Sequence, residues 1–274
     1  TLFPYTTLFQ SRSEERRVEE CTTISAAGGA KMVDGFAPLL DGFDRVPFGD
    51  EAALRGAIGD QTAGILVEPI QGEGGIRPIA VEQLRLMRAL CDEHGLLLIF
   101  DEVQCGLGRT GRMFAHEWAG ITPDLMSLAK GLGGGFPIGA VLATARAASG
   151  MVQSSHGSTF GGNPLATTVA NAVLDVMLEP GFLDQVKARG ELLHGRLEEM
   201  RARLPGSITE VRGQGLLVGI QTVEPNLDVA ARLRDAGLLT VPASDNVVRF
   251  LPPLTVSEAE IEEACTIFES VLAA

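Results

Sequence analysis

The sequence has few of the features that mark proteins that bind nucleic acids, span membranes or bind metal ions. Its 22 Lys and Arg are outnumbered by 35 Asp and Glu, and the net charge of −13 opposes binding to nucleic acid or to an anionic membrane. No apolar run approaches the ~20 residues of a membrane-spanning helix. The four Cys and four His are scattered, without the spacing of a disulfide framework or a zinc site. We therefore expect a cytoplasmic globular protein with reduced thiols.

The first 21 residues differ in composition from the rest of the chain. They contain no starting Met, and their charged residues follow the apolar stretch instead of preceding it. This order, without a small-residue cleavage site, argues against a signal peptide. The segment is similar to translated sequencing-adapter read-through, so we interpret residues 1–21 as a foreign or disordered tail.

Strand and helix patterns alternate from Thr22 to about residue 180. Short β-branched or wholly apolar runs predict strands over residues 64–68, 96–100, 125–129 and 138–144. Helical spacing predicts helices over residues 81–93 and 164–178, the second with Asn163 as its N-cap. The run 96–100 is apolar at every position, which is typical of a parallel strand covered on both faces. This alternation predicts an α/β fold with a mainly parallel sheet.

The character of the sequence changes after Pro180. Helical patterns cover residues 182–204 and 257–272, and strand-like patterns cover residues 210–222 and 246–251. We therefore predict three regions, which are the tail at 1–21, a large domain at 22–180 and a smaller C-terminal α+β domain at 181–274.

Three charged residues stand at the ends of predicted strands. Asp101 and Lys130 each follow an apolar strand, and Glu68 closes another. Taken singly, Asp101 would be read as a helix cap or surface acid and Lys130 as a solvated side chain. Ligands of open α/β sheets bind at the carboxyl ends of the strands, so the joint placement indicates a site. An acid beside a lysine suits pyridoxal phosphate, because the lysine can hold its aldehyde as a Schiff base while the acid keeps the ring nitrogen protonated.

A Gly-x-Gly-x-x-Gly pattern over residues 106–111 offers a different interpretation, a nicotinamide-dependent dehydrogenase. This pattern binds a dinucleotide where it joins a strand directly to a helix, whose N-terminus then receives the pyrophosphate. Here residues 101–105 intervene, and residues 112–118 lead into a loop. The dehydrogenase is therefore an alternative that nicotinamide binding would reveal.

Two more segments carry groups suited to anions. Residues 155–164 form a small polar loop before a helix, and its hydroxyls and backbone N–H groups suit a phosphate. Helix capping by Asn163 explains the same loop equally well. Arg249 is a single charge inside an apolar strand, so its guanidinium requires a carboxylate, from a substrate or from an internal partner such as Glu68.

Together these residues resemble the class III, fold-type I aminotransferases, and most closely the acetylornithine and ornithine branch. The resemblance runs from about Thr22 to the C-terminus. The matching stretches, in the family's order, are residues 68–75 (EPIQGEGG), 100–111 (FDEVQCGLGRTG), 129–137 (AKGLGGGFP), 156–166 and 212–217 (RGQGLL). The resemblance implies the large pyridoxal-phosphate-binding domain of this family, a smaller second domain and a homodimer.

The resemblance also implies roles at the cofactor. Lys130 would be the Schiff-base lysine and the base of the proton shift, and Asp101 would pair with the pyridinium nitrogen. Gln104 would bind the ring hydroxyl, and Val103 would pack on one face of the ring.

Further roles concern the phosphate and the substrate. Thr159, with Ser158, resembles the phosphate ligand that reaches across from a second subunit. Arg249 would bind the substrate α-carboxylate. Glu68 resembles the acid that pairs with this arginine when the donor presents its terminal amine.

The implied reaction moves the terminal amine of N-acetylornithine to 2-oxoglutarate in arginine biosynthesis. Ornithine, succinylornithine, 4-aminobutyrate and succinyl-diaminopimelate are alternative donors. The family's long N-terminal region, with part of the phosphate cradle and the aromatic residue stacked on the ring, is not found before Thr22. We therefore expect a fragment that is weak or inactive alone, or a non-catalytic binding module.

Overall fold

The computed structural model describes residues 5–10, 24–27, 33–155 and 157–273, the first of these segments by its backbone alone. The chain forms two compact units. Unit 1 comprises residues 1–69, 79–104 and 115–174, and unit 2 comprises residues 70–78, 105–114 and 175–274. Two short segments from the first half of the chain, 70–78 and 105–114, therefore belong to unit 2.

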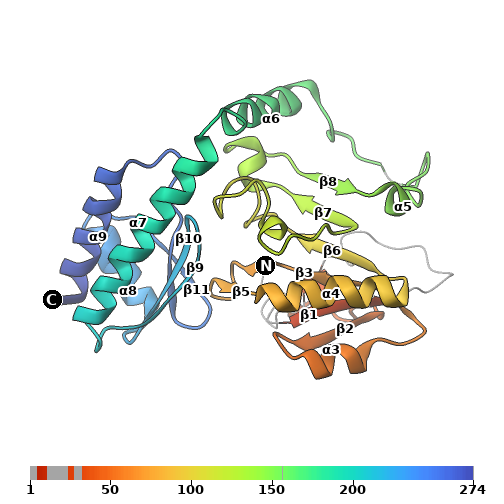
Figure 1. The fold of residues 1–274 in the computed structure, drawn as a ribbon, viewed down its shortest axis with the longest axis horizontal. Coiled ribbons are helices and arrows are strands. Elements are labelled where there is room, and N and C mark those ends of the chain that lie inside the picture. The colour runs from red at the N-terminus through yellow and green to blue at the C-terminus, as the bar shows by residue number, and fades with distance from the viewer. Residues whose placement is uncertain (1–4, 11–23, 28–32, 156, 274) are drawn as a thin grey trace. The chain divides into compact units, whose positions relative to one another are not determined.

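Within the described residues, unit 1 is built on a six-stranded sheet with a parallel centre (Figure 1). The strand order is β2-β1-β3-β6-β7-β8, in which β3, β6 and β7 are parallel and the other neighbours are antiparallel. The strands are β1 (Tyr5–Gln10), β2 (Phe43–Pro47), β3 (Thr62–Val67), β6 (Leu97–Asp101), β7 (Leu125–Leu128) and β8 (Ala140–Ala143). The predicted α/β fold is confirmed, with a sheet that is parallel at its centre and antiparallel at both sides.

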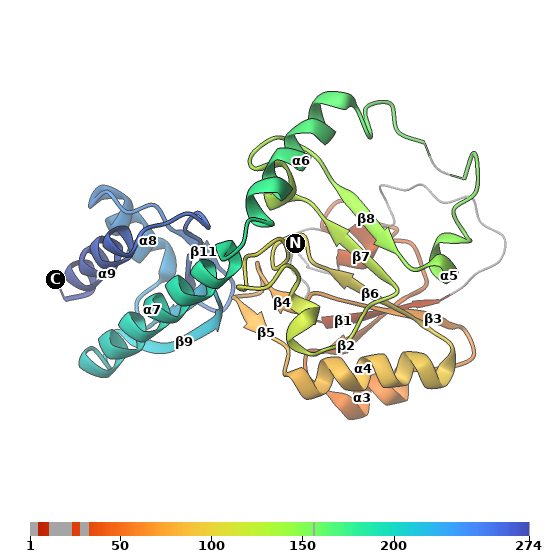
Figure 2. The same ribbon diagram turned by 45° about the horizontal axis from the view of Figure 1, so that its top comes forward.

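Helices α3 (Glu51–Ala57) and α4 (Val81–His94) lie on one face of this sheet (Figures 1 and 2). The prediction for residues 81–93 is confirmed, and α4 ends where Gly95 takes the left-handed φ of 69° that terminates many helices. Its buried side chains follow the helical spacing of the sequence and are Leu84, Met87, Leu90 and Cys91. Other helical segments of this part are η1 (Ala115–Trp118), η2 (Lys130–Gly133), α5 (Ala145–Ala148) and α6 (Pro164–Met177).

Strand β6 lies between β3 and β7 at the parallel centre of the sheet. Its Leu98 and Phe100 are fully buried against the α4 side of the core, while Leu97 and Ile99 are half-buried. Parallel neighbours on both sides, β3 and β7, satisfy its backbone hydrogen bonds. The wholly apolar run therefore does form a central parallel strand, fully buried on one face.

Unit 2 combines an antiparallel sheet with three helices. The strand order is β11-β12-β10-β9, formed by β9 (Ile208–Gln214), β10 (Leu217–Thr222), β11 (Val241–Ala243) and β12 (Val247–Phe250). The helices are α7 (Phe182–Arg203), α8 (Asn226–Asp235) and α9 (Glu258–Ala273). The hairpin of β4 (Ile70–Gln71) and β5 (Arg77–Pro78) completes the unit. The predicted helices at 182–204 and 257–272 are confirmed to within a residue or two at each end.

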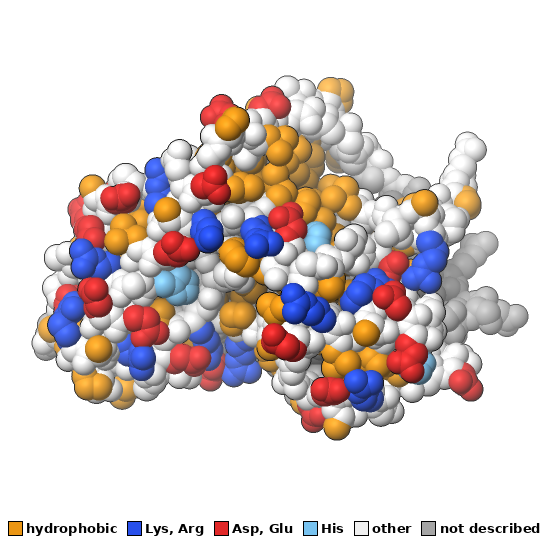
Figure 3. Space-filling view, viewed as in Figure 1, with side chains coloured by type: hydrophobic (Ala, Val, Ile, Leu, Met, Phe, Trp, Pro, Cys, Tyr) orange, Lys and Arg blue, Asp and Glu red, His pale blue; other side chains and the backbone are white. Residues whose placement is uncertain are grey.

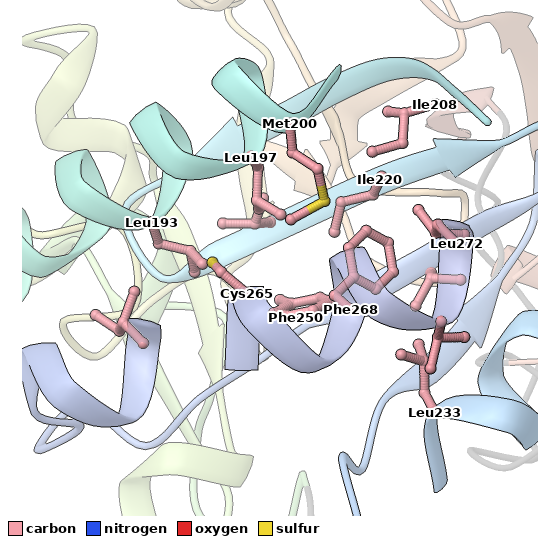
Figure 4. Packing of buried hydrophobic residues seen from close by; sticks show 14 of the residues in the cluster. Leu193, Leu197, Met200, Ile208, Ile220, Leu233, Phe250, Cys265, Phe268 and Leu272 are labelled. Carbon is pink, nitrogen blue, oxygen red and sulfur yellow. The ribbon is translucent and has the colours of Figure 1, made fainter. Parts of the chain in front are cut away.

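The core of unit 2 is made by α7, α8, α9 and the sheet (Figure 4). Leu197 and Met200 of α7 and Phe268 of α9 are fully buried there, and the Phe268 ring meets Phe250 edge-on with centroids 5.2 Å apart. Apolar side chains at helical spacing on both helices produce this packing, which stabilises the unit by roughly 2 kcal/mol for each large side chain.

Helix α7 passes very close to the turn between β9 and β10. A Cβ atom on Gly190 would lie 2.6 Å from the Cα of Gly215, and a Cβ on Gly215 would lie 2.5 Å from the carbonyl carbon of Thr110. Both separations are shorter than any real contact of a Cβ atom. Glycine is therefore required at both positions for the helix and the loop to approach.

Part of the predicted tail lies in the described residues. Tyr5–Gln10 form β1, which pairs with β2 and β3, whereas residues 1–4 and 11–23 lie outside the described residues. The foreign origin of residues 1–21 stays a prediction. Acidic and basic side chains are mixed over the face shown in Figure 3, and hydrophobic side chains gather around α6. Among the described residues, no helix has both the length and the apolar composition that a membrane span needs.

Candidate active site

The carboxyl ends of β3, β6 and β7 bring three predicted residues to one edge of the unit 1 sheet. Glu68, which is buried, follows the last residue of β3, and Asp101 is the last residue of β6. Lys130 comes two positions after the end of β7. The three strands are parallel neighbours, with Val67 opposite Phe100 in the register. The structure thus assembles an acid, a second acid and a lysine where open α/β sheets bind ligands.

The Asp101 carboxylate is oriented by two donors. Its Oδ1 accepts hydrogen bonds from the backbone N–H of Val103 at 3.0 Å and from the hydroxyl of Ser127 at 3.2 Å. Ser127 is directly opposite Asp101 in the β6–β7 register. The carboxylate is therefore held between two strand ends, and its direction is fixed before any ligand binds.

Lys130 has an unusual backbone conformation. Its φ of 43° lies in the left-handed region, which costs a residue with a side chain about 1–3 kcal/mol. The short helix η2 stabilises this conformation, because its Leu132 N–H donates to the Ala129 carbonyl at 2.9 Å. The glycine-rich loop packs tightly, since a Cβ on Gly133 would lie 2.9 Å from Ile138 Cγ2. Strain of this kind gathers at functional sites, and here it falls on the predicted lysine.

Val103 and Gln104 form the turn that follows β6, and both are half-buried. The Oε1 atom of Gln104 is buried and has no hydrogen-bond partner among the described residues. A buried amide oxygen without a partner costs about 1–3 kcal/mol. This atom is therefore available to accept a hydrogen bond from a ligand.

The loop of Ser158 and Thr159 is exposed. The Ser158 hydroxyl accepts the N–H of Gly161 at 2.9 Å, and Asn163 Oδ1 caps α6 by accepting the N–H of Ala166 at 3.0 Å. Helix capping by Asn163 is confirmed, and His156 lies outside the described residues. The phosphate-binding role of Ser158 and Thr159 stays a prediction.

In unit 2 the buried Arg249 forms a bidentate ion pair with Glu73. The distances are 2.6 Å from Nη1 to Oε1 and 3.2 Å from Nη2 to Oε2. An internal partner therefore supplies the carboxylate that Arg249 requires, which was one of the two predicted possibilities. The predicted internal partner is Glu68, whereas the ion pair in unit 2 is made by Glu73.

Glu73 is brought to Arg249 by the β4–β5 hairpin. The carbonyl of Glu73 accepts the N–H of Ser244 at 3.1 Å, and the carbonyl of Gly75 accepts Arg212 Nε at 2.7 Å. Sequence reasoning missed Glu73, although it lies in the matching stretch 68–75. An apolar strand with a single arginine shows that a carboxylate is needed, but not which one.

Residues 106–111 do not form a dinucleotide-binding turn. In the described chain β6 leads into turns and then into η1, with no α-helix directly after the glycines. The Arg109 carbonyl accepts the Leu216 N–H, and the Arg109 guanidinium donates to the carbonyls of Leu216 and Pro252. Burial lowers the pKa of Arg109 to about 10. The segment is thus used to join parts of unit 2.

The chain is similar to one known protein family and to several known proteins. The profile of the aminotransferase class-III family matches residues 20–272. Acetylornithine aminotransferase 1 of Bradyrhizobium diazoefficiens is 61% identical over 252 residues, which are 92% of this chain and 62% of that protein. Acetylornithine aminotransferase of Brucella melitensis is 56% identical over 250 residues, covering 91% and 62% of the two chains.

Solved structures agree with these relatives. Ornithine aminotransferase of Toxoplasma gondii, in which pyridoxal phosphate occupies the active site partially, matches with a TM-score of 0.87 at 35% identity, over 92% of this chain and 61% of that one. Acetylornithine aminotransferase of Elizabethkingia anophelis matches with a TM-score of 0.80 at 36% identity, over 85% and 60%. The chain spans 62% of the length of the two curated relatives it matches above. Because the family profile extends over almost all of its residues, the chain belongs to the class-III aminotransferases.

Proposed function

We propose that this chain carries the cofactor-binding part of an acetylornithine-type aminotransferase. The observation that carries the proposal is the placement of Asp101 and Lys130 at the ends of neighbouring parallel strands. The whole protein would transfer the terminal amine of N-acetylornithine to 2-oxoglutarate, a step of arginine biosynthesis in the cytoplasm. Acetylornithine aminotransferases that are 54–61% identical over 91–92% of the chain support this donor.

The residues at the sheet edge fit pyridoxal phosphate. Bound there, the cofactor would supply an electron sink for the carbon that carries the transferred amine. The oriented carboxylate of Asp101 suits a protonated ring nitrogen. The buried Oε1 of Gln104 suits the ring hydroxyl as an acceptor, and Val103 would pack on the ring.

Lys130 would serve first as the point of attachment and then as a base. Its amine would hold the cofactor aldehyde until an amine substrate displaces it. The released amine would then carry the proton that leaves the carbon bearing the amino group. The left-handed backbone of Lys130 gives the side chain a direction that a regular strand or helix residue would not have at this point.

Arg249 would bind a substrate carboxylate, and Glu73 would pair with Arg249 when no such carboxylate is bound. A guanidinium that is nearly fully buried binds a carboxylate strongly, and Glu73 fills this role internally. Glu73 is more exposed than Arg249, so it can turn away when a substrate carboxylate arrives. We therefore assign to Glu73 the switching role that the resemblance gave to Glu68, and we keep Glu68 as a buried acid of the cofactor edge.

Ser158 and Thr159 would bind the cofactor phosphate across a homodimer interface, as the resemblance implies. Their exposure in this chain is compatible with a ligand shared between two copies. No group of three or more possible metal ligands lies among the described residues, and the proposed reaction requires no metal.

Uptake of pyridoxal phosphate by the 274-residue chain tests this proposal. We expect one equivalent to bind with a shifted absorption band, and Lys130→Ala to abolish the band. Lys187→Ala is the matched control, because Lys187 is an exposed lysine of α7 in the other unit. A chain that binds no cofactor, or binds it equally well after Lys130→Ala, would contradict the proposal.

Donor choice needs a second experiment, on a full-length relative that carries this segment. Glutamate formation from 2-oxoglutarate is measured with acetylornithine, ornithine, succinylornithine, 4-aminobutyrate and succinyl-diaminopimelate. A preference for acetylornithine is expected. If the 274-residue chain takes up the cofactor but forms no glutamate in the same assay, it is a binding module.

A further inference from the structure

Glu102 is a fully buried acid beside Asp101, and the proposed reaction gives it no role. Its carboxylate accepts three hydrogen bonds, from the N–H of Ala115 at 2.6 Å, from the N–H of His116 at 2.9 Å and from His116 Nδ1 at 2.9 Å. The side chain has no exposed surface. A buried carboxylate is stable only when such donors replace its water, so this arrangement is specific to an acid at position 102.

His116 contacts both neighbours of Asp101. Its ring lies 6.5 Å, centroid to centroid, from the ring of the fully buried Phe100, and its Nδ1 atom meets Glu102. Side chains alternate along a strand, so Phe100 and Glu102 share one face and Asp101 lies on the other. The backbone N–H of Glu102 extends the β6–β7 pairing by donating to the Ser127 carbonyl at 3.1 Å.

We propose that Glu102 and His116 are positioning residues that set the direction of the Asp101 carboxylate. By holding the residues before and after Asp101 on the buried face, they present Asp101 on the opposite face. The same hold fixes the start of the turn that carries Val103 and Gln104. The inference rests on the proposed function only in that pyridoxal phosphate is the ligand that Asp101 would bind.

The pair also links the two ends of the unit 1 chain that flank residues 105–114. The chain leaves unit 1 after Gln104 and returns to it at Ala115. Glu102 binds the N–H groups of Ala115 and His116, the first two residues after the return. Glu102 thus links the residue that follows Asp101 to the start of the segment that returns to unit 1.

Four variants of the 274-residue chain test the proposal. Glu102→Gln keeps the size but turns an NH2 group toward a backbone donor, and His116→Leu removes the ring donor. His116→Asn is the conservative variant, since its amide N–H can replace Nδ1–H. Glu93→Gln is the control, an exposed acid near the end of α4.

The first readout is amide hydrogen exchange at Val103 in the cofactor-free protein. The Val103 N–H donates to Asp101 Oδ1, so its exchange reports directly on the position of that carboxylate. We expect exchange about 10-fold faster in Glu102→Gln and His116→Leu, from the loss of one charge-assisted hydrogen bond. His116→Asn and Glu93→Gln should keep the parent rate.

The second readout is the absorption band of bound pyridoxal phosphate. We expect a displaced band in Glu102→Gln and His116→Leu, and the parent band in His116→Asn. If the parent chain takes up no cofactor, the proposed function fails, and the Val103 exchange still decides this inference. Unchanged Val103 exchange in the first two variants overturns it. Global unfolding of both also overturns it, because the pair would then be a general stabilising contact.

Discussion

The ion pair of Arg249 and Glu73 makes a prediction with two effects of opposite sign. Glu73→Gln removes the negative charge but keeps the size and one acceptor. Arg249 has a side chain only 4% exposed, so its charge is then left buried with an amide as its partner. The stability of unit 2 should fall, while the affinity for an added carboxylate should rise.

The magnitude follows from the burial of the two side chains. Breaking a fully buried ion pair costs about 3–5 kcal/mol. Glu73 is 36% exposed and the Gln amide still accepts a hydrogen bond, so we expect a loss of about 2 kcal/mol. Removing the internal competitor should tighten 2-oxoglutarate binding by about tenfold, equivalent to about 1.4 kcal/mol.

Urea denaturation followed by circular dichroism measures the first effect, and calorimetric titration with 2-oxoglutarate measures the second. Glu210→Gln is the matched control, because Glu210 pairs at 2.9 Å with Arg212 in the same unit but is half exposed. That exposed pair should contribute less than about 1 kcal/mol. If Glu73→Gln is as stable as the parent and binds 2-oxoglutarate no better, Glu73 is not the competitor of the substrate.

Three further predictions concern stability. His194 is half-buried, and this burial lowers its pKa despite favourable interactions with the Gly215 backbone and Glu198, so its neutral form stabilises the fold above pH 6.5 and this stability is lost as the pH falls. The melting temperature of His194→Gln should therefore depend less on pH between about 7 and 5 than that of the parent, and parallel curves would contradict this. Burial alone would raise the pKa of Asp124, but the Leu98 N–H, Arg88 and Arg146 lower it. Asp124→Asn should therefore cost about 2 kcal/mol in urea denaturation. Asp92→Asn, at an exposed acid that also pairs with Arg88, should cost less than about 1 kcal/mol, and equal losses in the two variants would contradict this account. Gly190→Ala should destabilise unit 2 by about 1–3 kcal/mol, whereas Gly195→Ala on the same helix, with open space around it, should stabilise it by up to about 1 kcal/mol; equal melting temperatures would refute the close approach of α7.

Local patterns in the sequence were sufficient to predict the helices and the central strands. The spacing of apolar residues and a following glycine gave α4, and Asn163 gave the start of α6. Asp101 and Lys130 could be predicted because each is a charged residue that follows an apolar strand. These features depend on neighbours in sequence, which is why they could be read without a structure.

Features that depend on distant partners could not be predicted. Glu73 and Arg249 are separated by 176 positions, and nothing near either residue indicates the other. Glu102 has no sequence pattern, because two of its donors are backbone N–H groups. The assignment of residues 105–114 to unit 2 likewise depends on the contacts of Arg109 with Leu216 and Pro252.

The direction of β8 was within reach of the sequence. The loop between β7 and β8 is occupied by the glycine-rich segment and η2, which are too short for the crossover that a parallel strand needs. Strand β8 accordingly pairs antiparallel to β7. Loop length, added to the apolar pattern, would have predicted this antiparallel strand at the side of the sheet.

The central claim is that Lys130 holds the cofactor beside Asp101. The most direct test is borohydride reduction of the chain after incubation with pyridoxal phosphate, followed by mass spectrometry of its peptides. The lysines of the sequence that could carry the reduced adduct are Lys31, Lys130 and Lys187. We predict one adduct per chain, on Lys130, and reduced yield in Asp101→Asn. An adduct spread over the three lysines, or found on Lys31 or Lys187 alone, would contradict the account.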